Sequence, residues 1–169
     1  MKKRSFLARV LQTAVAGIGL ALGLTLPAKG LTLDETGRVT ALLVELAPDF
    51  GPYAYDEEEA DRLFDEDAAW EGRIAAAGFS RDSWREALHA TFRGYLATIP
   101  ADEFAKRLSA PITRLEQAPG FSDEQKAEVR AWANEELAKL EAMREEGKSH
   151  ADAVMPHAEE LDALFNAEE

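Results

Sequence analysis

Large apolar side chains recur at steps of three and four residues between positions 79 and 99. The members of this stripe are Trp84, Leu88, Phe92, Tyr95 and Ile99. This spacing places them on one face of a helix with 3.6 residues per turn. Ser80 is a good N-cap, Phe79 and Trp84 have the spacing of a hydrophobic staple, and Pro100 follows the last turn. The pattern predicts a central helix over 79–99 in which Trp84 is buried.

The same spacing predicts further helices on both sides of this one. They cover residues 31–50, 68–77, 101–118, 122–146 and 149–165. Thr32 with Glu35, and Ser122 with Gln125, have the spacing of capping boxes. Pro111 predicts a kink or a division into two short helices within 101–118, and Gly147 is expected to end the helix that precedes it.

Alternating apolar patterns bounded by hairpin turns are absent from the sequence, so no strand is expected. The fold class is therefore predicted to be all-α. We expect a small bundle of about six helices, mostly antiparallel, that forms one domain over 29–169.

The first 28 residues have the composition of a signal peptide. An apolar run over 10–26 is preceded by four basic residues, Lys2, Lys3, Arg4 and Arg9. Ala28 offers a cleavage site after it. The alternative is an uncleaved inner-membrane anchor. Residues 3–7 resemble a twin-arginine signal with one arginine replaced by lysine, while general secretion is the default route. The chain is predicted to be periplasmic or secreted.

The chain is strongly acidic, and loss of the signal segment makes it more so. The 169 residues contain 32 acids and 19 lysines and arginines, for a net charge of −13. Residues 29–169 keep all 32 acids but only 15 of the bases, a net charge of −17. Such a charge repels nucleic acid and anionic membranes. The expected partner is an envelope protein or a cation, with membrane contact only if the signal segment is uncleaved.

The acids are most crowded in the segment 53–67, where eight of them accompany one base, Arg62. No register of this segment fits a calcium-binding loop, which needs a glycine at its sixth position. We expect a solvated surface that gains stability from added salt, because salt screens the repulsion between carboxylates. The candidates for an interaction surface are Tyr53, Tyr55, Asp56, Glu57, Glu58, Glu59 and Asp61.

Motifs for catalysis are lacking. The chain has no cysteine, no G-x-S-x-G elbow and no phosphate-binding glycine loop. We therefore predict no catalytic residue, no cofactor and no metal site. A weaker alternative is a metal site of His150, Asp152 and His157. The two histidines are two helical turns apart, about 10 Å, unless a break at Pro156 brings them together. Trp70, Trp84 and Trp132 are expected in the core.

Two resemblances accompany these patterns. Residues 121–125, Phe-Ser-Asp-Glu-Gln, are similar to the LTxxQ motif of Spy-like periplasmic chaperones and metal-stress proteins. The mature chain also resembles a set of uncharacterised exported helical proteins of Gram-negative bacteria. That likeness is carried by Gly78-Phe79-Ser80 with Trp84, by Pro119 followed by Ser122 and Gln125-Lys126, and by residues 152–156 followed by Glu160-Leu161-Asp162. It implies an exported helical fold and no activity.

These observations predict an exported, non-enzymatic helical protein that binds another protein, in a chaperone-like or stress-related role. Two alternatives stay open. One is a periplasmic protein that binds divalent cations through its acidic segment. The other is an enzyme of unrecognised type.

Overall fold

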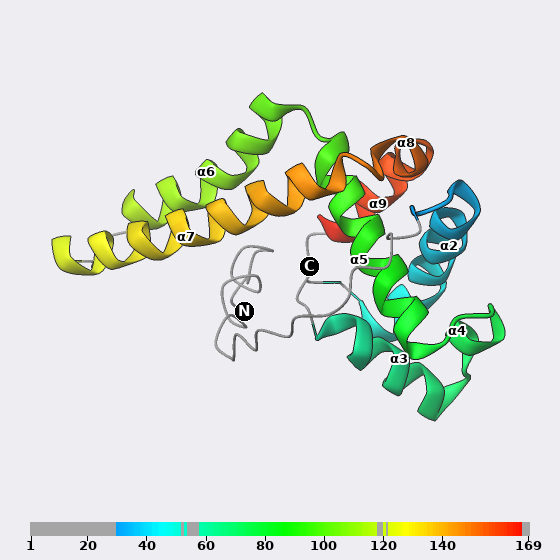
Figure 1. Ribbon diagram of the computed structural model, residues 1–169. Helices are drawn as coiled ribbons and strands as arrows, with labels where there is room; N and C mark the ends of the chain where they lie inside the picture. The colour runs from blue at the N-terminus through cyan, green and yellow to red at the C-terminus, as the bar shows by residue number, and fades with distance from the viewer. Residues whose placement is uncertain (1–29, 52, 54–57, 118–119, 121, 167–169) are drawn as a thin grey trace, which may run out of the picture.

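The computed structural model describes residues 30–51, 53, 58–117, 120 and 122–166, and all of their regular structure is helical (Figure 1). The predicted all-α bundle is confirmed. None of the helices in these residues is long and apolar enough to cross a membrane. In chain order they are α2 (Leu33–Phe50), α3 (Glu59–Trp70), α4 (Arg73–Ala76), α5 (Arg81–Thr98), α6 (Ala101–Gln117), α7 (Asp123–Gly147), α8 (Ala151–Val154), the 3₁₀ helix η1 (Met155–His157) and α9 (Ala158–Phe165).

Helix α5 lies at the centre of a body formed with α2, α3, α4, α8, η1 and α9 (Figure 1). Its predicted stripe is buried, and Trp84 has no exposed surface. The Phe79 and Trp84 rings pack edge to face with centroids 5.7 Å apart, which confirms the staple. At the other end of α5, Phe92 and Tyr95 pack against Phe165 of α9. One continuous stripe therefore organises the core of the body.

The N-termini of α2, α5 and α7 lie where the sequence predicts them. Thr32 Oγ1 accepts a hydrogen bond from the Glu35 amide at 3.2 Å, and Ser122 Oγ accepts one from the Gln125 amide at 3.2 Å. Ser80 caps α5 in the same way, with Ser83 as its partner. These bonds satisfy amides that have no partner within the helix, so local sequence suffices to place the three helix starts.

Two element boundaries differ from the prediction. A helix was expected to begin at 68, but α3 begins at Glu59 and ends at Trp70, and Gly72 with φ of 66° separates it from α4. Ala60 and Leu63 are fully buried, and this narrow apolar stripe holds an otherwise acidic helix against the body. Helix α6 continues through Pro111 and is not divided into two.

Helices α6 and α7 form an antiparallel hairpin that projects from the body (Figure 1). The hairpin joins the body where α7 crosses α5. A Cβ atom at Gly147 would overlap the carbonyl oxygen of Arg93 and lie 2.9 Å from the Gly94 nitrogen. Gly147 is the last residue of α7 and its φ is not positive. Gly147 therefore ends α7 as predicted, and it also allows α7 to pack closely against the backbone of α5.

Candidate functional site

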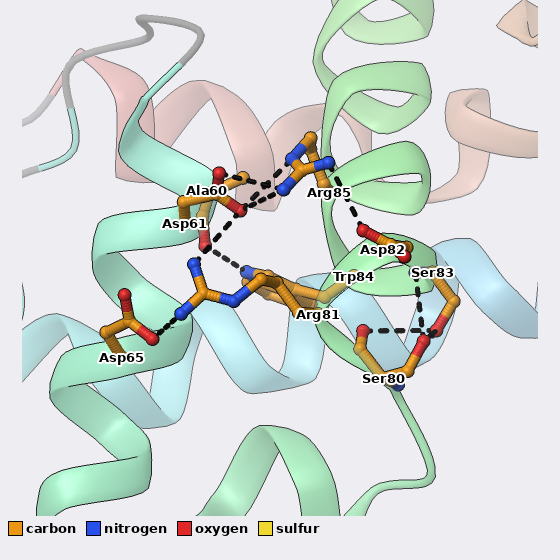
Figure 2. A network of polar contacts seen from close by, with 9 residues as sticks. All are labelled: Ala60, Asp61, Asp65, Ser80, Arg81, Asp82, Ser83, Trp84 and Arg85. Carbon is orange, nitrogen blue, oxygen red and sulfur yellow. Dashed lines mark hydrogen bonds and ion pairs between the residues drawn. The ribbon is translucent and has the colours of Figure 1, made fainter.

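Two acids of α3, Asp61 and Asp65, are paired with arginines that come from α5 (Figure 2). The Asp61 carboxylate accepts hydrogen bonds of 2.7 and 2.8 Å from Arg85 Nη2 and of 3.0 Å from Arg85 Nε. Arg81 lies 3.6 Å from Asp61 and also forms an ion pair with Asp65. The indole of Trp84 donates to the Ala60 carbonyl at 3.0 Å between the same two helices. The acidic helix is thus fastened to the body by bases some 20 positions later in the chain.

Asp67 continues this pairing inside the protein. It is 1% exposed and accepts hydrogen bonds from the Ile74 amide at 2.8 Å and from Arg73 Nε at 3.3 Å. Arg73 also donates hydrogen bonds to the Asp49 carboxylate at 2.8 Å and to the Glu45 carbonyl at 3.1 Å. Asp67 therefore has a structural role, in which it joins α3 to α4 and, through Arg73, to α2.

The structure describes four of the seven residues of the predicted interaction surface: Tyr53, Glu58, Glu59 and Asp61. Tyr53 is buried, its hydroxyl donates to the Leu43 carbonyl at 2.7 Å, and burial raises its pKa well above the ordinary value for tyrosine. Glu58 is exposed, whereas Glu59 is half-buried and accepts from Arg62. The Asp61 carboxylate forms an ion pair with Arg85. Tyr55, Asp56 and Glu57 lie outside the described residues.

The exposed aromatic residue next to the acidic segment is Trp70, with 73% of its surface accessible. The expectation that Trp70 lies in the core is wrong. It is the last residue of α3, beyond the buried stripe of Ala60, Leu63 and Asp67. Alanines just before it in α3 and just after it in α4 are also exposed. We call this set the Trp70 surface, and its members are Ala68, Ala69, Trp70, Ala75 and Ala76.

The residues of the alternative metal site are not brought together. Among the described residues, no three His, Asp or Glu side chains are grouped so that they could hold a metal ion. His150 is half-buried, and burial together with the nearby charge of Arg93 lowers its pKa. The His157 ring lies beside Gly37 of α2 instead. His89 is a half-buried residue of α5.

A polar cluster that the sequence did not suggest ties α9 to α5 and α6. We call it the Asp162 cluster, and its members are Tyr95, Arg107, Asp162 and Asn166. Asp162 Oδ1 accepts hydrogen bonds of 2.5 Å from Tyr95, 2.5 Å from Arg107 and 3.0 Å from Asn166. Burial opposes ionisation of Asp162, but the bonds from Arg107 and Tyr95 outweigh it and lower its pKa. The members of the cluster come from three separate parts of the chain, α5, α6 and the α9 end, and no local sequence motif predicts their contact.

The hairpin carries apolar residues beyond its junction with the body. At the junction Phe104 is buried, and Arg144 lies over its ring and donates to the Ile99 carbonyl at 3.0 Å. Farther out, half-buried residues line α6 and α7 and do not belong to the core cluster of the body. We call them the outer hairpin surface, which consists of Ile112, Val129, Trp132 and Leu137.

In comparisons with known proteins, no family model, no curated protein and no solved structure matches the chain.

Proposed function

We propose that this is an exported, non-enzymatic protein-binding protein, and that the outer hairpin surface contacts its partner. The single observation that carries the proposal is the half-buried apolar set Ile112, Val129, Trp132 and Leu137 on a projecting pair of helices. Two helices make only one layer. An apolar stripe in such a layer is covered on one side and can accept a third helix or an extended apolar segment on the other.

The base of the hairpin supports this role because it is fixed in place. The close crossing at Gly147 and the Asp162 cluster both lie where the hairpin meets the body. A surface presented on a fixed arm loses little conformational freedom on binding, which favours affinity. A chaperone-like activity fits the same surface, since an unfolded client offers apolar segments of many sequences.

The proposal is tested by the ability of the purified protein to suppress heat-induced aggregation of a model client, measured by light scattering. We expect suppression by the wild type and its loss in Trp132→Glu. Leu33→Glu is the matched control, because it places the same charge at an exposed apolar residue of the body, and it is expected to retain suppression. If the wild type does not suppress aggregation, and a photo-crosslinker at position 132 forms no adduct with any envelope protein, the proposal fails.

Export is tested separately by the mass of the protein recovered from the envelope fraction. The proposal predicts a chain that begins at Lys29, because the basic and apolar segment before it is removed after Ala28. A recovered mass that still includes Met1 would favour an anchored protein.

A further inference from the structure

We propose a second binding surface, distinct from the hairpin: the Trp70 surface binds a basic protein segment and takes an arginine or lysine side chain over the indole of Trp70. This inference does not depend on the proposed function of the hairpin. In Figure 1, α3 and α4 lie in the body, away from the projecting ends of α6 and α7.

Trp70 gives this surface its apolar character. A tryptophan with 73% of its surface accessible leaves a large ring in water. Ala68 and Ala69, which precede it in α3, and Ala75 and Ala76 of α4 are exposed as well. Alanines leave both the ring and the surface beside it open to a partner. Such an area can cover the aliphatic stem of a lysine or arginine, while the ring attracts its charged end.

The carboxylates near Trp70 favour a cationic occupant. Glu66 lies one helical turn before Trp70 and Glu71 follows it directly. Their side chains are 44% and 57% exposed, and they pair with Arg62 and Arg73 respectively. The last turns of α2 and α3 contain no basic residue of their own, and the base that reaches the ends of both helices is Arg73 of α4. The carboxylates here outnumber the two guanidiniums that pair with them. Arg62 is shared between Glu59 and Glu66, and Arg73, only 19% exposed, is shared among Asp49, Asp67 and Glu71.

The occupant is a side chain on a protein rather than a free metal ion. A metal ion needs several oxygen or nitrogen ligands that converge on one point, and the described residues offer no group of three. A guanidinium or ammonium instead gains from the flat face of the indole and from separate carboxylates around it. The net charge of the whole chain, −13, draws basic segments towards it.

The test uses the purified protein and a fluorescent peptide of six arginines, with binding followed by anisotropy. The wild type is expected to bind it, and Trp70→Ala to bind it roughly 5- to 30-fold more weakly, the range that corresponds to a cation–π contact. Net charge is the same in both proteins, so general attraction to an acidic surface cannot produce this difference. Trp132→Ala is the matched control and should bind within about twofold of the wild type. A labelled peptide of six glutamates should not bind.

Folding of Trp70→Ala is checked by thermal melting, which should be unchanged because the side chain is exposed. Equal binding by the wild type and Trp70→Ala overturns the proposal, and so does absence of binding to the arginine peptide. A loss of equal size in Trp132→Ala would also overturn it and would place the basic segment on the hairpin. Failure here leaves the aggregation assay of the hairpin unaffected, because that assay reports on position 132.

Discussion

The body and the hairpin are built from the same kind of helix but are covered to different degrees. In the body α5 has neighbours on several sides, and Trp84 is fully buried. In the hairpin α6 and α7 cover each other, and Trp132 stays half-buried. Trp84 and Trp132 both lie on apolar stripes with helical spacing, and the stripe around Trp84 is the denser of the two. The comparison teaches that periodicity predicts a helix face, while the number of neighbouring helices decides how far that face is buried.

Charge separates the two regions further. Residues 101–147 hold 11 acids and seven bases, whereas 29–100 together with 148–169 hold 21 acids and eight bases. The acids of the body include the α3 residues that α5 arginines pair. The hairpin is closer to neutral and is fixed to the body at its base. Both the repulsion between acids and the ion pairs that offset it are therefore concentrated in the body, and the outer hairpin carries less net charge.

The largest expected effect comes from the core of the body. Trp84→Ala should lower the free energy of unfolding by about 3–5 kcal/mol, because it removes a fully buried ring, its contact with Phe79 and its bond to the Ala60 carbonyl. Trp132→Ala should cost about 1–2 kcal/mol, since its ring is only half-buried. Urea unfolding followed by circular dichroism measures both. Equal losses would show that hairpin and body are packed alike.

The junction of the two regions comes next. Gly147→Ala should cost about 3 kcal/mol, because the new methyl group would meet the backbone of Arg93 and Gly94 and force α7 away from α5. Gly30→Ala is the control, since nothing lies within 4 Å of a Cβ there, and it should be neutral within about 0.5 kcal/mol. Chemical unfolding of both variants checks this. A neutral Gly147→Ala would mean that the crossing is easily spread apart.

The Asp162 cluster gives a smaller effect that depends on pH. Asp162→Asn should cost about 1 kcal/mol at pH 7, because it removes charge-assisted bonds at a partly exposed site. The folded pKa of Asp162 is lowered, so its contribution is present above the ordinary pKa of the carboxyl and is lost as pH falls through the lowered value. Melting temperatures of the two proteins should therefore converge in acid. A constant difference from neutral pH down to the acid range would contradict this assignment.

The smallest effect concerns the ion pairs between α3 and α5. Arg85→Gln should lower the melting temperature slightly at low salt, and about 0.5 M salt should remove most of the difference, because the pair is partly exposed.

The melting temperature of the wild type at low and high salt tests the expectation that the crowded acids of 53–67 repel one another. A gain in stability with salt would indicate net repulsion in 53–67, and a loss would indicate that the arginines of α5 dominate.

The sequence by itself determined the helical class, the starts of α2, α5 and α7, and the burial of the α5 stripe. These features depend on side chains three or four positions apart, so a local reading contains the interactions that produce them. The burial of Trp84 follows from its place on the densest stripe. The same logic failed for Trp70, because its exposure depends on which helices cover the end of α3.

Tertiary structure alone decided the partners of the polar residues. Counting charges along the chain gives Arg62 as the one base of the acidic segment, but folding brings Arg81 and Arg85 to Asp61 from α5. Tyr95 and Asp162 are 67 positions apart, and Gly147 acquires its role only when α7 crosses α5. Hydrogen bonds, ion pairs and close backbone contacts act over a few ångströms, and the packing of helices, rather than their spacing in sequence, sets those distances.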